Sequence, residues 1–439
     1  MDIRRRTAAW AAVFALVSCR TGGNPLLRAA PVANPTFLAR DVSFLAGDAL
    51  EGRGTGTAGN DSARAWIARR MEQLQLEPLF VASDCPGHCP PSFVQPFVAR
   101  MSGAARNNLP AALATANVGG MIRGSDPALR GQWVILGAHY DHLGRRAFGA
   151  RDPQLPDAIR NGADDNASGV AAILELARLL RAHPPRRSVA ILAFSAEELG
   201  LLGSEYLVTH PPLPLDSVQA MLNFDMVGRL RDDKLMVYGT ATASELPAAV
   251  NQANTAPAFK LTAIGDGEGP SDHASFYRRN LPVLHFFTDA HDDYHTSTDD
   301  ADKINAAGMQ RVVAFAERIA RTLADRPTHL TFVRAPATAT RTAAARSGGP
   351  QPSMGTIPDM GAGDVPGLRL SGVSPGSAAE HAGLRTGDVI VEFDGQTITD
   401  LQSYSDALYS HKPGDEVGVT VLRGGERMTV RVTLGRRGG

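Results

Sequence analysis

The middle of the chain alternates between short apolar runs and longer amphipathic segments. Short apolar runs bounded by turn residues are typical of buried strands, and apolar residues that recur every three or four positions indicate helices. Strands are expected at 132–138, 187–194, 219–225, 234–239 and 281–287, and helices at 167–182, 200–209, 244–254 and 305–324. This alternation predicts the α/β class, with a mixed, mostly parallel sheet flanked by helices on both faces.

The residues before this alternation have a weaker pattern. An amphipathic helix is expected at about 59–75, after the Gly/Thr-rich turn at 51–57. Residues 81–131 are rich in Pro, Ala and Asn and lack sustained periodicity, so we expect loops there, with a short hairpin around 117–124.

A second pattern follows a change of composition. Residues 326–352 are rich in Ala, Thr, Pro, Arg and Gly, which is typical of an interdomain linker. Beyond it, strands are expected at 367–373, 388–393, 416–422 and 428–434, and helices at 377–382 and 400–410. We therefore expect a large domain at 36–325 and a small β-rich domain at 353–436.

The first residues resemble an export signal. Arg4 to Arg6 precede the apolar stretch 8–17, which is too short to span a bilayer. A basic start and a short apolar core predict a secretory signal. The stretch ends in Leu16-Val-Ser-Cys19, which resembles a bacterial lipoprotein signal, although an ordinary cleaved signal with an incidental Cys is the alternative. We expect a signal peptide at 1–19 and a tether at 20–35.

Two further observations bear on the compartment. Arg20 follows the Cys, and resemblance to lipoproteins of two-membrane bacteria then implies an outer-membrane lipid anchor, with the protein facing the periplasm or the exterior. In an exported protein, Cys85 and Cys89 around a Pro-Gly turn predict a local disulfide. A second metal site that uses His88 is the alternative, and it is disfavoured because too few ligands lie nearby.

Composition excludes other classes of protein. With 439 residues the chain exceeds one ordinary core, and 43% hydrophobic residues describe a globular protein. The net charge of -1 provides no basic field for nucleic acid.

Acidic residues and a histidine follow three of the expected strands. Glu197 and Glu198 stand together after one of them, and two adjacent carboxylates are costly unless a cation or a proton holds them. His139 and Asp141 follow another strand, and Asp225 closes a third. In such sheets the ligand site collects beyond the carboxyl ends of the strands. These residues are therefore expected to share one site.

The other candidate ligands also lack sulfur. Asp164 and Asp165 lie between Gly162 and Gly169, and His295 lies near the end of the larger domain. A His/Asp/Glu set without thiolates suits a hydrolytic zinc centre better than a structural zinc site or an iron–sulfur cluster. The residues alone thus indicate a metallohydrolase.

Five motifs strengthen this interpretation by their order along the chain: Ala138-His-Tyr-Asp-His, Gly162-Ala-Asp-Asp-Asn-Ala-Ser-Gly, Ala196-Glu-Glu-Leu-Gly, Asn223-Phe-Asp-Met and Tyr294-His-Thr-Ser-Thr-Asp. From about Phe37 to Leu323 the chain resembles the co-catalytic dizinc aminopeptidases, which include leucine-type aminopeptidases secreted by bacteria. The resemblance implies a zinc exopeptidase-like fold and the hydrolysis of N-terminal residues from peptides with a free N-terminus.

The resemblance also implies roles for single residues. Asp165 would bridge two zinc ions, one completed by His139 and Asp225 and the other by Glu198 and His295.

Three more residues match functional positions of the family. Glu197 would be the general base, and Asp141 would orient the ligand His139. Tyr294 would stabilise the tetrahedral oxyanion. Asp164 is expected to be a helix cap or a solvated carboxylate, and His142, His285 and His291 are expected to be structural or to support the ligands.

Other functions are open at this point. A glutaminyl cyclase shares the fold and much of the ligand set but commonly works with one zinc, and carboxypeptidases or dipeptidases belong to the same clan. A non-catalytic scaffold is disfavoured because all five ligands and Glu197 are present. Ser271-Asp-His273 suggests a hydrolase triad, but the chain has no Gly-x-Ser-x-Gly elbow.

The C-terminal pattern resembles a PDZ domain. Gly383-Leu-Arg-Thr-Gly-Asp-Val-Ile and Phe393-Asp-Gly-Gln-Thr-Ile match bacterial envelope proteases, and Met354-Gly-Thr-Ile would be the carboxylate-binding loop. Such domains bind the C-terminus of an extended peptide along a sheet edge. A docking or spacing role is the alternative.

Overall fold

The computed structural model describes residues 31–82, 89–100, 110–146, 149–152, 154–155, 157–334, 352–358, 367–373, 376–399, 403–404, 407–408 and 410–436. The expected signal peptide, most of the tether, Cys85 and the central part of the linker lie outside these residues. Cys89 is disulfide-bonded. Within the described part of the chain, no helix has the length and apolarity needed to span a bilayer.

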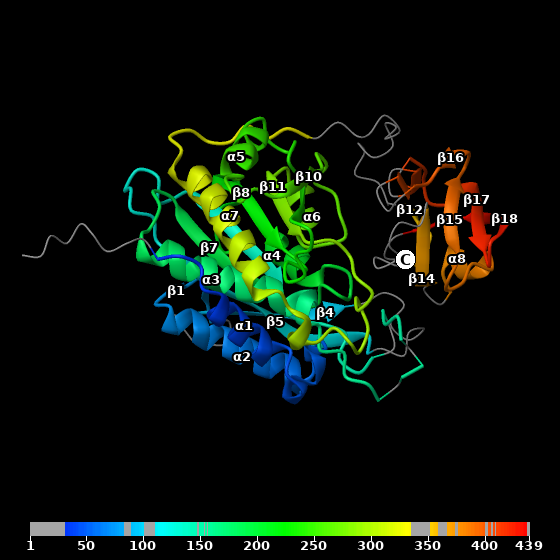
Figure 1. Cartoon of the computed structure of the whole chain (residues 1–439), viewed down its shortest axis with the longest axis horizontal. Coiled ribbons are helices and arrows are strands. Elements are labelled where there is room, and N and C mark those ends of the chain that lie inside the picture. Colours follow the sequence, from blue (N-terminus) through cyan, green and yellow to red (C-terminus); the bar gives the residue numbers. More distant parts are fainter. Residues whose placement is uncertain are drawn as a thin grey trace, which may run out of the picture. The chain divides into compact units, whose positions relative to one another are not determined.

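The larger domain contains, among its described residues, a nine-stranded sheet in the order β1-β5-β7-β6-β8-β11-β9-β10, with β4 beside β5 (Figure 1). Its strands are β1 Glu77–Pro78, β4 Val94–Arg100, β5 Ala112–Ile122, β6 Trp133–His139, β7 Ser188–Phe194, β8 Val218–Phe224, β9 Lys234–Tyr238, β10 Lys260–Ala263 and β11 Val283–Phe287. The central strands β7, β6, β8 and β11 run parallel, whereas β5 and β9 join them antiparallel. The expected mixed sheet is confirmed, with its parallel strands in the centre.

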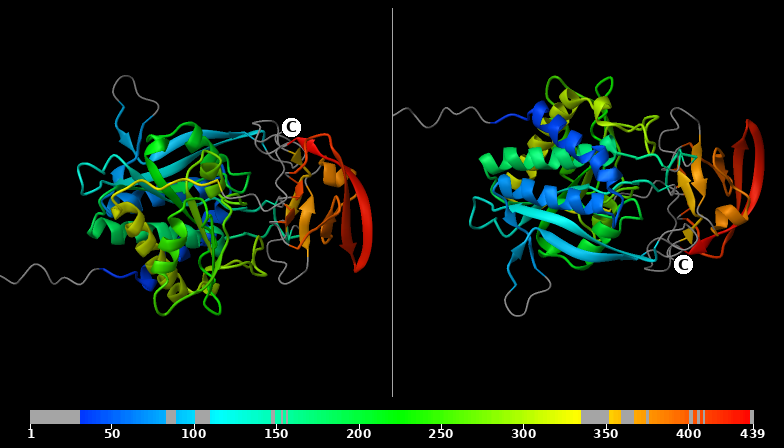
Figure 2. Two further views of the ribbon diagram at one scale, coloured as in Figure 1. Left: turned by 90° about the horizontal axis from the view of Figure 1, so that it is seen from above. Right: turned by 90° about the horizontal axis from the view of Figure 1, so that it is seen from below.

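Helices cover both faces of this sheet. They are α1 Pro35–Leu45, α2 Ala58–Gln73, α3 Gly169–Ala182, α4 Leu202–Thr209, α5 Leu246–Ala253, α6 His273–Tyr277 and α7 Ala306–Asp325. The right-hand view of Figure 2 shows α1, α2 and α3 on one side of the sheet, where α3 and α7 contact β6. On the opposite face, α4 contacts β5 and α6 contacts β8. Val134 and Leu136 accordingly belong to one buried cluster and Ile135 to another, because neighbouring strand residues face opposite sides.

The structure corrects the expectation for residues 81–131. The expected short hairpin around 117–124 lies mainly inside β5, which pairs with β4 in a long antiparallel hairpin. A Cβ at Gly119 would lie 2.7 Å from the Phe80 ring, and one at Gly120 would lie 3.1 Å from Leu76. Close packing therefore requires small residues here, so the strand lacks the alternating apolar pattern that would have predicted it.

The structure also moves both ends of the larger domain. Ala33 is buried, and the Asn34 side chain caps α1 by accepting the N–H of Thr36, so folded structure begins inside the expected tether. Leu330 is buried, and Phe332 pairs with Ala243 in an isolated bridge. The first residues of the expected linker therefore pack on this domain.

The smaller domain has its own sheet and core. Its described strands follow the order β13-β14-β15-β17-β18, with β16 beside β15. The elements are β12 Pro352–Ser353, β13 Thr356–Pro358, β14 Leu368–Val373, α8 Ala378–His381, β15 Val389–Phe393, β16 Gln396–Thr397, β17 Glu416–Arg423, β18 Glu426–Thr433 and β19 Gly435–Arg436. Residues 403–404 and 407–408 of the expected helix 400–410 are helical, and its other described residue, Ser410, is in a turn. The β-rich C-terminal domain is confirmed.

Candidate metal centre

The candidate ligands meet at one edge of the large sheet. His139 is the last residue of β6, and Asp225 directly follows β8. Glu197 and Glu198 follow β7 after a turn in which Ala196 has a φ of 59°. Because β6, β7 and β8 are parallel, their carboxyl ends lie at the same edge, and side chains distant in sequence converge there.

Five side chains form two donor sets that share one carboxylate. In the first set, which we call site A, His139 Nε2 lies 3.2 Å from Asp165 Oδ1 and 3.4 Å from Asp225 Oδ1. In the second set, site B, His295 Nε2 lies 3.0 Å from Asp165 Oδ2 and 3.2 Å from Glu198 Oε2. Asp165 therefore presents one oxygen to each set, as a bridging carboxylate must.

The donor atoms fit zinc in type and spacing. Ligands about 2.0–2.2 Å from a tetrahedral zinc ion lie about 3.3–3.6 Å from one another, and the His-to-carboxylate separations of 3.0–3.4 Å in the two sites are close to this range. In addition, Asp225 Oδ1 is buried and has no hydrogen-bond partner among the described residues, which is costly unless a cation or proton is nearby. Asp165 with His139 and Asp225 would hold one ion, and Asp165 with His295 and Glu198 would hold another.

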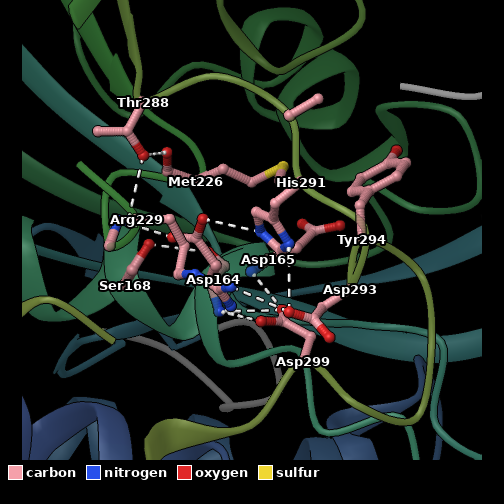
Figure 3. Close-up of polar contacts among 12 residues, drawn as sticks. Asp164, Asp165, Ser168, Met226, Arg229, Thr288, His291, Asp293, Tyr294 and Asp299 are labelled. Atoms are coloured by element: carbon pink, nitrogen blue, oxygen red, sulfur yellow. Dashed lines mark hydrogen bonds and ion pairs between the residues drawn. The ribbon is translucent and has the colours of Figure 1, made fainter. Parts of the chain in front are cut away.

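The main chain at Asp165 is held by a carboxylate that the sequence analysis missed. Asp299 is fully buried, and its Oδ2 accepts the N–H groups of Asp164, at 3.0 Å, and Asp165, at 3.1 Å (Figure 3). Burial and the nearby Asp164 carboxylate raise the pKa of Asp299 to about 6. The position of Asp299 at the end of the Tyr294–Asp299 motif was the only sequence signal of this role.

Asp164 differs from its expected role as a helix cap or solvated group. It is fully buried, its Oδ1 accepts the N–H of Gly228 at 2.6 Å, and its Oδ2 lies 3.1 Å from His291 Nε2 (Figure 3). Asp164 thus ties the loop that carries Asp165 to the segments that follow β8 and β11.

Glu197 borders site A. Its Oε2 lies 3.9 Å from His139 Nε2, and its side chain is 11% exposed. Burial and the charges of Glu198, Asp272 and Asp225 raise the pKa of Glu197 well above its usual value, against the opposing effect of His139. A carboxylate in this setting is suited to holding a proton, although cations bound nearby would oppose the rise.

Asp141 touches its neighbours through different atoms than expected. His139 Nδ1 lies 3.1 Å from the main-chain carbonyl of Asp141, whereas the Asp141 carboxylate is 3.9 Å from that nitrogen. The carboxylate instead accepts the N–H of Glu197 at 3.1 Å and the hydroxyl of Thr55 at 2.8 Å. The main chain of Asp141 therefore orients His139, and its side chain fixes Glu197.

Tyr294 stacks on the ligand candidate that follows it. Its ring lies 3.8 Å from the His295 ring, centroid to centroid, at an angle of 19°. Burial and the carboxylates of the site raise the pKa of Tyr294 well above its usual value, so the phenol keeps its proton and can donate a hydrogen bond.

The segment Ser271-Asp-His273 does not form a catalytic triad. Ser271 Oγ accepts the side-chain N–H of Asn223 at 2.8 Å, and the His273 ring stacks on His285 at 4.5 Å. Among the described residues, neither ring nitrogen of His273 has a hydrogen-bond partner. The proton relay that a triad requires is therefore missing.

Comparisons with known proteins agree with this geometry. Residues 117–320 match the model of peptidase family M28, and residues 352–434 match the model of the PDZ domain. A probable zinc metalloprotease of Leptosphaeria maculans is 32% identical over 198 residues, which cover 44% of this chain and 40% of that protein. Aminopeptidase YwaD of Bacillus subtilis is 30% identical over 188 residues, which cover 40% and 38%. The chain thus spans about two fifths of the length of these relatives.

Solved structures share the fold. A zinc-dependent exopeptidase from Parabacteroides distasonis aligns with a TM-score of 0.54 at 19% identity, over 68% of this chain and 100% of that one. The glutaminyl cyclase of Bacteroides thetaiotaomicron aligns with a TM-score of 0.53 at 18% identity, over 67% and 99%. The zinc exopeptidase-like fold expected from the motifs is confirmed.

Proposed function

We propose that this chain, whose residues 117–320 match the model of peptidase family M28, is a two-zinc aminopeptidase. The observation that carries the proposal is the pair of donor sets that share Asp165. Each set has three protein donors, which leaves room at each ion for a water molecule or the substrate.

The proposed reaction is hydrolysis of the first peptide bond. Two zinc ions bound here would supply Lewis acidity to the scissile carbonyl and lower the pKa of the attacking water. Glu197 would accept the proton of that water as its oxygen adds to the carbonyl carbon, and would pass the proton to the leaving amine when the C–N bond breaks. The Asp141 carboxylate would keep Glu197 in place by accepting the main-chain N–H of Glu197.

Cleavage from the N-terminus is supported by two lines of evidence. The motif order resembles that of dizinc aminopeptidases, and one relative that is 30% identical is itself named an aminopeptidase. Tyr294 would donate its phenolic hydrogen to the oxyanion.

An activity screen with metal-stripped and zinc-restored protein tests the proposal. Aminoacyl reporter substrates should be hydrolysed only after zinc is restored, and Glu197→Gln should keep both ions while kcat falls by about 10²–10⁴. An N-terminal glutaminyl peptide separates the alternatives, because a cyclase would release ammonia and leave the peptide bond intact. Cyclisation without hydrolysis, in protein with a single ion, would refute the aminopeptidase proposal.

We also propose a cellular location and a second binding site. The sequence of residues 1–20 supports export and lipid attachment at Cys19, which would place the enzyme at the outer membrane. Cys19→Ser should then move the protein out of the membrane fraction. Wild-type protein found in the cytoplasm with an intact N-terminus would disprove the proposed location. The PDZ domain would bind the C-terminus of a peptide.

A further inference from the structure

His142 contacts site B, although its position in the sequence indicated no defined role. The side chain is fully buried, and its Nδ1 lies 2.7 Å from Glu198 Oε1. The same nitrogen is 3.7 Å from Asp165 Oδ2, and the His142 ring meets the His295 ring edge-on at 5.5 Å. His142 is therefore next to all three residues of site B.

The main chain around the His142 ring leaves it little freedom to move. A Cβ at Gly162 would lie 2.5 Å from Cγ and Cδ2 of the ring, so the backbone of Gly162 packs directly against it. The main chain of His142 is itself held, because it pairs with Gly54 in an isolated parallel bridge. A ring held in this way can fix the position of its hydrogen-bond partner.

The hydrogen bond runs from His142 to Glu198. The inference places an ion at Glu198, and a carboxylate that binds a cation is deprotonated, so it only accepts hydrogen bonds. His142 Nδ1 must then be the donor. Glu198 Oε1 is engaged by His142, while Oε2 faces His295 at 3.2 Å.

We propose that His142 is a positioning residue that holds Glu198 by one oxygen, so that only the other oxygen is presented to the ion of site B. The inference rests on the proposed function, because it requires an ion in that site. By occupying Oε1, His142 makes Glu198 a one-oxygen ligand, which keeps coordination positions of the ion open for water and substrate.

The spacing argues against His142 as a ligand itself. Two donors 2.7 Å apart, each about 2.1 Å from an ion, would subtend about 80° at it, which is much less than the tetrahedral angle. The separations of 3.0 and 3.2 Å within site B correspond to wider angles. The distance between Nδ1 and Oε1 is instead that of a charge-assisted hydrogen bond.

Metal titration of two matched variants tests the inference. His142→Leu removes the donor, whereas His142→Asn can place an amide N–H close to the position of Nδ1. With a chromophoric chelator as competitor, His142→Leu should lower the affinity for one of the two zinc ions by about 10–100-fold and leave the affinity for the other unchanged. His142→Asn should recover a substantial part of that affinity. Equal losses in both variants would overturn the donor role.

Two further measurements separate this inference from the proposed function. If His142 acts through Glu198, removing both side chains should cost little more than removing Glu198 alone. The zinc affinity of site B in the double variant His142→Leu/Glu198→Ala should therefore differ by less than about twofold from that in Glu198→Ala. Full additivity would overturn the inference, as would three imidazoles per two zinc ions by X-ray absorption spectroscopy. Wild-type protein that binds a single ion would overturn the proposed function, whatever the variants do.

Discussion

Arg53 offers a test of how the fold supports the metal centre. Its side chain is fully buried, and burial lowers its pKa only to about 10, so the guanidinium is charged at neutral pH. It donates at 2.5–2.8 Å to four main-chain carbonyls, those of Leu45, Tyr140, Asn161 and Gly162. Tyr140 follows the ligand candidate His139, and Gly162 precedes Asp165, so Arg53 joins the two loops that carry these ligands.

The cost of Arg53→Met follows from these contacts. Four hydrogen bonds to a charged donor contribute about 6–12 kcal/mol in gross terms, at about 1.5–3 kcal/mol each. Loss of the buried charge returns several kcal/mol of desolvation, so the expected net loss of unfolding free energy is about 3–5 kcal/mol. Because both ligand loops lose their shared anchor, zinc affinity should fall as well.

Arg187→Met is a matched control. Arg187 is equally buried and donates to Gln132, Ala324, Arg326 and Thr328. It precedes β7 at the end of the strand opposite Glu197, roughly 20 Å away at about 3.3 Å per residue. Its loss should destabilise the domain without changing zinc affinity.

The assay combines urea unfolding with metal competition. Trp66 and Trp133 lie in the larger domain, and the third tryptophan, Trp10, lies in the expected signal peptide. In protein without residues 1–19, tryptophan fluorescence therefore reports on the larger domain alone. Unfolding of metal-free protein gives the stability of each variant, and chelator competition gives its zinc affinity. A loss below about 1 kcal/mol for Arg53→Met, or equal weakening of zinc by Arg187→Met, would refute this reasoning.

Three further predictions follow from the site and the domain boundary. Asp165→Asn should lose both zinc ions, whereas His139→Ala and His295→Ala should each lose one, as measured by elemental analysis. Loss of a single ion in Asp165→Asn would contradict the proposal that both ions share Asp165. Burial lowers the pKa values of His139 and His295, but nearby carboxylates raise both well above the usual value. Zinc must therefore displace about two protons, and zinc affinity should fall as pH falls. Calorimetry in buffers of different ionisation enthalpy measures this proton release, and its absence would contradict the prediction. Truncation after residue 334 should keep activity on short substrates. Truncation after residue 326 removes the buried Leu330 and should lower the unfolding free energy by about 1.5–3 kcal/mol. Equal stability of the two truncated proteins would contradict this prediction.

The sequence determined the central architecture and the identity of the candidate ligands. Strands β6 and β7 are almost entirely apolar, and β8 is interrupted only by Gln219 and Asn223, because parallel strands in the middle of a sheet are buried on both faces. His139 and Asp225 lie where these runs end, which is a local signal. Asp165 and His295 were found through motifs whose order along the chain needs no structure.

Only the tertiary structure decided the contacts between distant segments. The strand β5 was missed because its glycines are required by packing against Phe80 and Leu76, a constraint with no periodic signature. Asp299, His142 and Arg53 meet the ligand loops across 56 to 135 residues of sequence, and Asp141 divides its contacts between its carbonyl and its carboxylate. Hydrogen bonds of this kind depend on where a fold places each atom, and residue types along the chain carry no record of it.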